Sequence, residues 1–383
     1  MLDFQFVQKV NVLFGNGSVK QTGELMESLG VKKAFLVCDE GVVKAGIVQK
    51  VIDSIKGAGL DCYLYDKVLV DPPASIIEAG VDEFNASGCD VVIGVGGGSS
   101  IDTAKGINLL RYNDKPILRF TDFSTPMNLS PGLVVVPTTS GTGSEVSDGI
   151  VITDENHQKH PVLAVNAMVQ YAIIDPELMT GMPPHLTAST GLDTLAHSVE
   201  GYSSSVANFF TDQFCEANIA TIAKWLPIAV KDGANLDARG HMAVCCSIGG
   251  WMLGYGHTNA GHSFAHVLGS WFNLPHGYGC AYAEPWVLEF NAPAIPEKTR
   301  RVGELLGASF TGNETPEEIG AKTRDAYIAF RDSLGVKKAS EFPHDKAKFQ
   351  EVAVDVENEL FQIFQVRKMT AADALEILNK IYA

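Results

Sequence analysis

Short runs of β-branched and aliphatic residues alternate with longer amphipathic stretches over the first half of the chain. Continuous apolar runs indicate buried strands, and apolar positions that recur every three or four residues indicate helices. The expected strands cover residues 33–39, 62–65, 90–95 and 133–136, and the expected helices cover residues 42–55, 74–85 and 101–109. Strands that are apolar throughout and separated by helices predict a parallel sheet with both faces covered.

The β pattern fades after Asp175. Pro183 and Pro184 stand where a helix can begin, and amphipathic stretches follow from His185 to the carboxyl end. We therefore expect an α/β domain over residues 1–180, followed by an all-helical domain over residues 181–383.

Composition narrows the class of protein. Of the 383 residues, 46% are hydrophobic and 19% are charged, which excludes a disordered chain. Asp and Glu total 45 against 29 Lys and Arg, and the net charge of −16 would repel a nucleic-acid backbone. The first residues lack a signal-peptide pattern, and no apolar run reaches the roughly 18 residues of a membrane span. We expect a cytoplasmic protein that binds neither nucleic acid nor membrane.

The seven cysteines are an odd number without C-x-x-C spacing, which argues against a disulfide framework and a zinc knuckle. They are expected to be reduced core residues.

A glycine-rich loop follows the expected strand 90–95. Gly96, Gly97 and Gly98 let the backbone approach a ligand, and the helix that follows directs free N–H groups and its positive dipole end towards the loop. The loop therefore predicts a diphosphate site. Ser99 and Asp102 have capping-box spacing, so we also expect them to cap this helix.

A second polar loop, Pro-Thr-Thr-Ser-Gly-Thr-Gly-Ser-Glu at residues 137–145, follows the next strand. Ligands of open α/β sheets bind at the carboxyl edge, where both loops would meet. Asp39 ends an earlier strand, where its carboxylate could accept from both ribose hydroxyls and repel a 2′-phosphate, which favours NAD over NADP. The ordinary dinucleotide fingerprint has its acidic residue later in the chain, so a variant of the Rossmann topology is expected. The alternative role of Asp39 is a helix cap.

Candidate metal ligands cluster in the second half. Asp193 and His197 are four residues apart, which places them on one helix face, and His262 and His266 repeat that spacing before His276. One oxygen and three nitrogen donors suit Fe²⁺, Zn²⁺ or Mn²⁺. These five candidates are one more than a tetrahedral site needs, and spacing does not decide which of them is free.

Four segments together make the chain resemble the iron-containing alcohol dehydrogenase family over nearly its whole length. They are the glycine loop, the hydroxyl loop, the segment from Gly191 to Tyr202 and the segment from His262 to Gly277. The resemblance implies metal ligation by Asp193, His197, His262 and His276, with Fe²⁺ the expected ion and Zn²⁺ an alternative. It leaves His266 unligated beside the nicotinamide and the substrate, as the catalytic residue.

The same resemblance implies an amino-terminal dinucleotide-binding domain, a helical metal-binding domain, NAD bound between them, and dimers or larger homo-oligomers. The expected cofactor-binding residues are Asp39, Gly97, Gly98, Ser99, Asp102, Thr138, Thr139, Thr142, Lys159 and Leu178. Asp71 departs from the pattern because many relatives have Asn there. The segments 255–261 and 364–367 also depart from it, so the identity of the substrate does not transfer.

The expected reaction is reversible hydride transfer between NAD(H) and a small primary alcohol or its aldehyde. One alternative is a metal- and NAD-dependent lyase that resembles dehydroquinate synthase. Another is an oxoacid reductase, because the segment 262–276 also resembles the maleylacetate reductase branch. A non-catalytic alternative is a nucleotide-binding sensor that uses the metal as a structural clasp.

Overall fold

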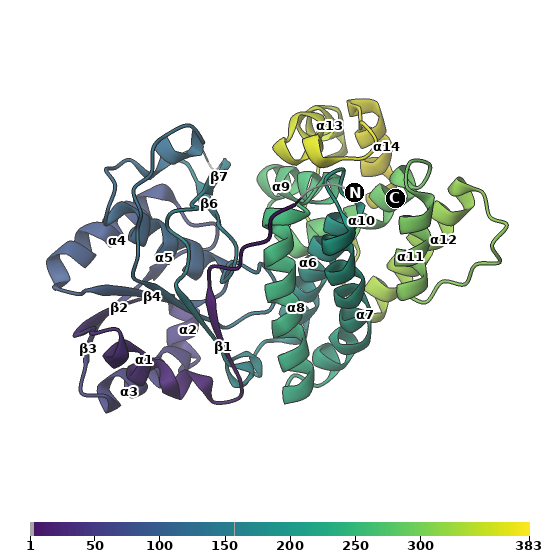
Figure 1. Cartoon of the computed structure of the whole chain (residues 1–383). Helices are drawn as coiled ribbons and strands as arrows, with labels where there is room; N and C mark the ends of the chain where they lie inside the picture. Colours follow the sequence, from purple (N-terminus) through teal and green to yellow (C-terminus); the bar gives the residue numbers. More distant parts are fainter. Residues whose placement is uncertain (1–3, 157) are drawn as a thin grey trace. The chain divides into compact units, whose positions relative to one another are not determined.

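The computed structural model describes residues 4–156 and 158–383. Within them, contacts divide the chain into two compact units, which are residues 7–181 and residues 4–6 with 182–383 (Figure 1). Residues 1–3 and His157 lie outside the described residues. Residues 1–3 begin the segment in which the sequence lacks a signal-peptide pattern. The sequence had placed the division after residue 180.

The unit of residues 7–181 is built on a six-stranded parallel sheet, as predicted, with the strand order β1-β8-β5-β4-β2-β3. Its strands are β1 (Asn11–Phe14), β2 (Lys33–Asp39), β3 (Asp61–Val68), β4 (Val91–Gly96), β5 (Leu133–Pro137) and β8 (Tyr171–Ile174). An antiparallel pair, β6 (Gly149–Thr153) and β7 (Lys159–Leu163), forms a second sheet. The sequence pattern missed β1, β6, β7 and β8. Runs of four or five residues are ambiguous by periodicity alone, although β5, of the same length, was predicted.

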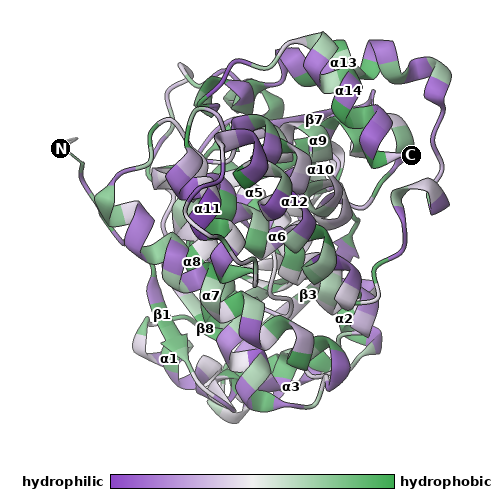
Figure 2. Ribbon diagram, turned by 90° about the vertical axis from the view of Figure 1, so that its right-hand side faces the viewer, coloured by the Kyte–Doolittle hydropathy of each residue, from purple (hydrophilic) through white to green (hydrophobic). Residues whose placement is uncertain are grey.

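Helices cover both faces of the parallel sheet. On β2, Leu36 packs in one core cluster with Val51 of α3 (Ile47–Gly57), whereas the ring of Phe35 meets Phe84 of α4 (Ala74–Ser87) at 5.4 Å. Successive residues of a strand point to opposite faces, so α3 and α4 lie on opposite sides. Figure 2 shows both apolar and polar residues along α3. The other helices of this unit are η1 (Ser18–Gln21), α1 (Thr22–Ser28), α2 (Glu40–Lys44), α5 (Gly98–Leu110), η2 (Ile117–Thr121) and η3 (Pro176–Met179).

Two local predictions in this unit are wrong. The single helix expected over residues 42–55 is divided into α2 and α3 by Gly46, whose φ of 70° is outside the helical range. The capping box expected from Ser99 and Asp102 does not form, because α5 begins at Gly98 and its N-cap is Gly97. Asp102 instead accepts hydrogen bonds from Ser144 Oγ at 2.5 Å and from the backbone N–H of Val151 at 2.9 Å.

The second unit is helical, as predicted. Its α-helices are α6 (Pro184–Ser203), α7 (Phe209–Lys231), α8 (Leu236–Tyr255), α9 (Ala260–Phe272), α10 (His276–Asn291), α11 (Pro296–Leu305), α12 (Pro316–Ser333), α13 (Phe349–Asn358) and α14 (Ala371–Ile381). Short 3₁₀ turns, η4 (Ala339–Glu341), η5 (Lys346–Lys348) and η6 (Leu360–Phe364), connect the last of them. Among the described residues, no helix is both long enough and apolar enough to cross a bilayer.

Helix α6 is buried over most of its length and contacts α7, α8, α9 and α10. The close approach to α7 depends on Gly191, where a Cβ atom would lie 2.2 Å from Leu226 Cδ1. Because its neighbours exclude solvent, any polar side chain on α6 needs a partner inside the protein.

All seven cysteines are described, and all are free thiols, as predicted. Cys62 and Cys89 are only partly buried, so the expectation that every cysteine is a core residue is wrong for these two.

Lys105 gives a test of how α5 holds the polar loop after β5. Its buried ammonium donates to Ser144 Oγ, Ser147 O and Gly149 O, each at 2.9 Å. The variant Lys105→Met leaves these acceptors and Asp102 without their cation, so we expect the free energy of unfolding to fall by about 3–5 kcal/mol. Urea denaturation measures this change. The exposed Lys50→Met on α3 is the control, and equal stability of the two variants would contradict the prediction.

Candidate functional site

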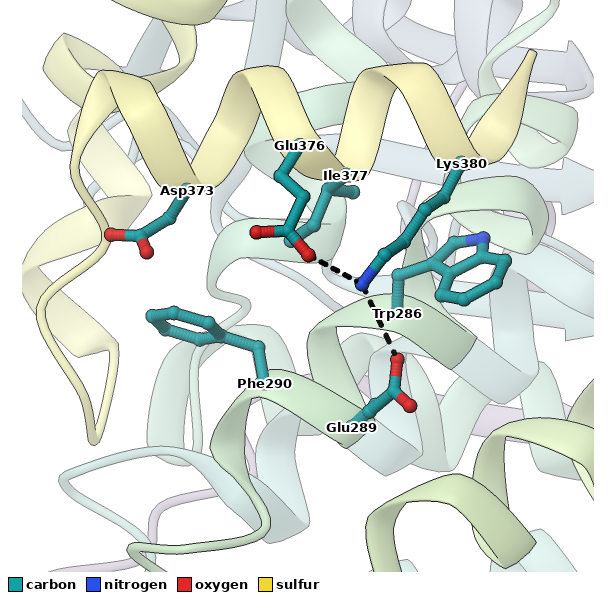
Figure 3. A pocket seen from close by; sticks show the side chains of 7 residues that line it. All are labelled: Trp286, Glu289, Phe290, Asp373, Glu376, Ile377 and Lys380. Atoms are coloured by element: carbon teal, nitrogen blue, oxygen red, sulfur yellow. Dashed lines mark ion pairs between the residues drawn. The ribbon is translucent and has the colours of Figure 1, made fainter. Parts of the chain in front are cut away.

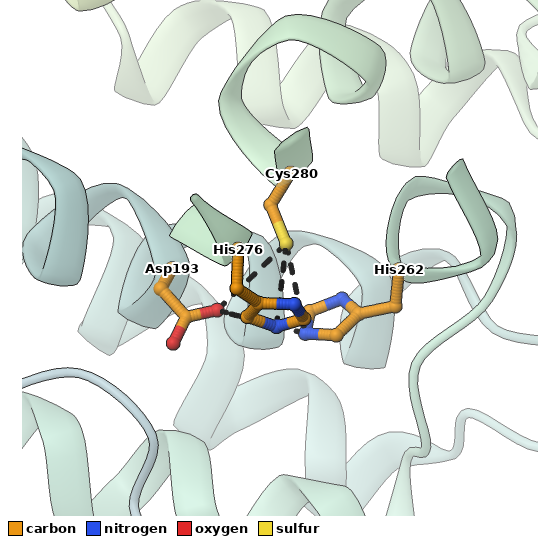
Figure 4. Close-up of side chains that lie close together, drawn as sticks. All are labelled: Asp193, His262, His276 and Cys280. Carbon is orange, nitrogen blue, oxygen red and sulfur yellow. Dashed lines mark hydrogen bonds and ion pairs between the residues drawn. The ribbon is translucent and has the colours of Figure 1, made fainter. Parts of the chain in front are cut away.

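Three helices of the second unit bring the predicted metal ligands together. Asp193 and His197 lie one turn apart on α6, His262 is near the start of α9, and His276 is the first residue of α10. Asp193 Oδ1 is 3.7 Å from His197 Nε2, 3.7 Å from His262 Nε2 and 3.4 Å from His276 Nε2. Figure 4 shows the side chains of Asp193, His262 and His276 directed towards one another. The three predicted imidazole donors therefore lie around one oxygen of the fourth donor, Asp193.

Burial and mutual charge control the protonation of these groups. Burial alone would raise the pKa of Asp193, but the neighbouring imidazoles outweigh it and hold that pKa well below its usual range. Burial lowers the pKa of His197 to about 4 and also lowers that of His276, despite the nearby Asp193 carboxylate. A carboxylate and neutral imidazoles are the forms that bind a metal ion.

Glu200 fixes the orientation of His262. His262 Nδ1 donates to Glu200 Oε1 at 2.5 Å, so Nε2, which faces Asp193, is the nitrogen with a lone pair in the neutral ring. The Glu200 and Asp193 carboxylates outweigh burial and raise the pKa of His262, so a metal ion that binds Nε2 would displace a proton. The other carboxylate oxygen accepts from the backbone N–H groups of Asn259 at 2.5 Å and His262 at 3.2 Å. A carboxylate behind a histidine ligand is a common arrangement at metal sites. The donor set and this support fit a divalent cation.

A second buried carboxyl lies behind Glu200. Burial and the nearby Glu200 raise the pKa of Glu284 well above its usual value, so this group stays protonated while Glu200 carries the charge. A Cβ atom at Gly261 would lie 2.2 Å from Glu284 Oε2 and 2.7 Å from Glu200 Oε1. Only glycine therefore fits before His262 in this packing.

His266 lies beside the donors but has a different partner. Its Nδ1 lies 3.0 Å from Glu359 Oε1, and its ring stacks on that of His276 with centroids 5.3 Å apart. Its side chain is 22% exposed, whereas those of His197 and His262 are each 4% exposed. His266 therefore has contact with solvent that the two buried imidazoles lack.

Glu359 is held by several donors at the start of η6. Ser263 Oγ and the backbone N–H of Phe361 donate to its Oε2 at 2.7 and 2.8 Å. Burial would raise its pKa, but these hydrogen bonds and that to His266 outweigh burial and lower it. Glu359 is therefore an ionised partner for His266.

Sequence reasoning missed three residues near this centre. Glu200 lies within the segment from Gly191 to Tyr202 but was not singled out, although its position three residues after His197 places it on the same face of α6. Cys280 follows His276 by four residues, the spacing already used to pair the histidines, and it faces the donors in Figure 4. Glu359 had no local signal, because it is 93 residues from His266.

In the first unit, the two predicted loops meet at the carboxyl edge of the sheet. Strands β4 and β5 are neighbours, and Thr138 N donates to Gly96 O at 3.0 Å. A Cβ atom on Gly97 would lie 3.1 Å from Thr139 Oγ1, and one on Gly98 would lie 2.6 Å from Thr142 Cγ2. Ser99 follows in the first turn of α5. These glycines let the hydroxyl loop pack against the start of α5.

Asp39 lies at the same edge, at the end of β2. Its Oδ1 accepts from the backbone N–H of Val42 at 3.0 Å, and its Oδ2 accepts from Ser100 Oγ at 3.2 Å. The alternative expected for this residue, a helix cap, is therefore present at the start of α2. These two hydrogen bonds use one acceptor site on each carboxylate oxygen, so they do not exclude a ribose contact.

The remaining predicted cofactor residues have different surroundings. Lys159 Nζ pairs with Asp71 Oδ1 at 2.7 Å, so the residue that departs from the family pattern is the partner of a predicted ribose contact. Asp71 has a φ of 51°, in the left-handed region. Leu178 is buried in the core cluster of the sheet, with 2% of its surface exposed. Asp102 points to Ser144, as described above, rather than to the helix start.

A small groove between α10 and α14 is separate from the predicted ligands (Figure 3). Its volume is about 100 Å³, and its lining residues are Trp286, Glu289, Phe290, Asp373, Glu376, Ile377 and Lys380. Lys380 Nζ lies 2.8 Å from Glu376 and 3.8 Å from Glu289, so the lysine partly neutralises the acidic lining. The groove contains none of the predicted donors and is too small for a dinucleotide.

Comparison with known proteins identifies the family. A profile described as iron-containing alcohol dehydrogenase matches residues 10–176, and the profile of the carboxyl-terminal part of the same family matches residues 187–382. The chain is 36% identical to choline dehydrogenase of Bacillus subtilis (strain 168) over 83% of its length and 80% of that protein. It is 37% identical to 1,3-propanediol dehydrogenase of Klebsiella pneumoniae over 90% of its length and 91% of that protein.

The crystal structure of a 1,3-propanediol oxidoreductase has the same fold. The two structures superpose with a TM-score of 0.94 and 31% sequence identity, over 99% of this chain and 100% of the other. With profiles that match both units, the chain belongs to the iron-containing alcohol dehydrogenase family of oxidoreductases.

Proposed function

We propose that the chain is a metal-dependent, NAD(H)-linked oxidoreductase that interconverts a small primary alcohol and its aldehyde. The observation that carries this proposal is the grouping of His197, His262 and His276 around Asp193 Oδ1. The relatives' names, choline dehydrogenase and 1,3-propanediol dehydrogenase, both denote oxidation of alcohols. They give no support to the lyase, the maleylacetate reductase or the non-catalytic sensor.

In this proposal, Asp193, His197, His262 and His276 hold a divalent ion, with Fe²⁺ expected and Zn²⁺ the alternative. When bound, this ion supplies a Lewis acid for the substrate oxygen. Glu200 keeps His262 Nε2 directed at the site through its hydrogen bond to Nδ1. Because Glu284 is protonated, Glu200 is the one carboxylate available to balance the charge behind His262.

His266 moves the proton that alcohol oxidation releases. Its Nδ1–H donates to Glu359, which leaves Nε2 to accept the proton, and its partial exposure provides a route to water. Bound NAD⁺ would accept the hydride from the alcohol carbon, so aldehyde, NADH and one proton would be the products. Aldehyde reduction returns the same proton from His266.

The dinucleotide lies along the carboxyl edge of the sheet in this proposal. Backbone N–H groups at Gly97, Gly98 and Ser99 face the diphosphate at the start of α5, and Thr138, Thr139 and Thr142 donate from the neighbouring loop. Asp39 accepts from the ribose hydroxyls. Asp102 is proposed to support this loop through its hydrogen bond from Ser144. Lys159 is proposed to contact a ribose of the dinucleotide, and Leu178 to lie beside its nicotinamide ring.

We also propose a cytoplasmic enzyme that forms homodimers or larger homo-oligomers and binds no nucleic acid. The net charge of −16 and the resemblance to the family support these assignments.

Two variants separate metal binding from proton transfer. We expect Asp193→Ala to lose bound metal and turnover together, because it removes the oxygen around which the imidazoles gather. His266→Ala should keep the metal and lower kcat by about 10²–10⁴-fold. The measurements are metal content and anaerobic NADH oxidation with short aldehydes, ketones and oxoacids after Fe²⁺ or Zn²⁺ loading. Loss of metal from His266→Ala would overturn the ligand assignment, and no NADH oxidation with any carbonyl compound would overturn the proposed function.

Glu359 is proposed as the residue that positions His266. Glu359→Gln removes the anionic acceptor that holds Nδ1–H, so kcat should fall by about 100-fold while metal content and the KM for NAD⁺ stay unchanged. Glu359→Asp should recover part of the lost kcat. The exposed Glu351→Gln on α13 is the matched control. A KM increase without a change in kcat would count against this role.

Asp39→Asn tests the choice between NAD and NADP. Asparagine keeps the helix cap at α2 but removes the negative charge that would repel a 2′-phosphate. We expect the ratio of kcat/KM for NAD⁺ to that for NADP⁺ to fall at least about tenfold, equivalent to about 1.4 kcal/mol. Steady-state kinetics with both cofactors give this ratio. An unchanged ratio would show that another residue makes the selection.

A further inference from the structure

Cys280 places a sulfur atom among the candidate metal ligands. It is fully buried on α10, one turn after His276. Its Sγ lies 3.8 Å from Asp193 Oδ1, 3.8 Å from His276 Nε2 and 3.9 Å from His262 Nε2. In Figure 4, Sγ points towards the two imidazoles and the carboxylate.

These separations match those between ligands of one ion. Bonds of about 2.3 Å to sulfur and 2.0–2.1 Å to nitrogen or oxygen, at tetrahedral angles, separate the sulfur from the other donors by about 3.6 Å. The observed distances are within a few tenths of an ångström of this value. The donor atoms of Asp193, His262, His276 and Cys280 all lie within 4.8 Å of one another, which is close enough for a shared cation.

A purely apolar role explains this position less well. The Cys280 side chain packs with Ala196 and Ala265, as a small core residue would. However, the end of the side chain faces three polar atoms of the candidate ligands. A thiol can donate one weak hydrogen bond to Asp193 Oδ1, but the two imidazole nitrogens at nearly the same distance give the sulfur the position of a further ligand.

We propose that Cys280 is a thiolate ligand of the metal ion and adds a sulfur donor to the oxygen of Asp193 and the nitrogens of His197, His262 and His276. The sulfur bonds to the ion, and the thiol proton leaves to solvent as the ion binds. Sulfur favours ions such as Zn²⁺, Co²⁺ and Fe²⁺ over Mn²⁺ and Mg²⁺, which prefer oxygen. The inference rests on the metal of the proposed function, but its test reads the metal directly.

Cobalt substitution tests the proposal on the full-length protein. After chelation of the resident metal, one equivalent of Co²⁺ is added anaerobically and the ultraviolet and visible spectrum is recorded. Wild-type protein should show a near-ultraviolet thiolate-to-cobalt charge-transfer band. The band should be absent from Cys280→Ser, which retains bound Co²⁺, and present in Cys215→Ser, which removes a buried thiol of α7.

The outcomes distinguish a failure of the sulfur ligand from a failure of the metal centre. Wild-type protein that binds one Co²⁺ without the band would overturn the sulfur ligand and leave the proposed metal centre intact, and this result does not depend on whether the variant folds. A band that persists in Cys280→Ser would also overturn it. Wild-type protein that binds neither Co²⁺ nor Zn²⁺ would overturn the metal centre itself. As a second measurement, the affinity of Cys280→Ser for Zn²⁺ should fall at least about tenfold, whereas that for Mn²⁺ should change less.

Discussion

A carboxylate buried within a bundle of helices is the constraint on which the second unit depends. Asp193 has lost its water, and the desolvation of an unpaired carboxylate would cost several kcal/mol. Three imidazoles lie within 3.7 Å of its Oδ1, but burial keeps two of them, His197 and His276, from holding a proton easily. The proposed divalent cation would supply the positive charge that neutral imidazoles lack, and it would use the same lone pairs.

The need to bury these groups also explains residues that perform no chemistry. Gly261 leaves room for the carboxyls of Glu200 and Glu284, and Gly249 of α8 allows a close approach to His197. Glu200 accepts three hydrogen bonds from Asn259 and His262, and these offset part of the free-energy cost of burying its carboxylate. Small residues and shared hydrogen bonds therefore bring the helices close enough to form one site.

In the unit of residues 7–181, the proposed cofactor site is formed largely by backbone groups. In the proposed function, the diphosphate binds N–H donors that carry no bulky side chain, which Gly97 and Gly98 would provide at the start of α5. Thr139 and Thr142 occupy the space beside these glycines. Behind them, Lys105 and Asp102 hold Ser144 and the strand that follows, so the loop is fixed from within the protein.

The sequence by itself determined the fold class, the parallel strands and the candidate donors, because each depends on local patterns. Buried strands are continuous apolar runs in the sequence. Residues four apart on a helix share a face, and this spacing identified Asp193 and His197, and His262 and His266, as candidate metal ligands. Tertiary structure alone decided that Glu359 accepts from His266 across 93 residues and that Asp71 pairs with Lys159. It also decided that α5 begins before Ser99, which leaves Asp102 free to bind Ser144. Local periodicity carries no information about such partners, since they meet only when distant segments pack.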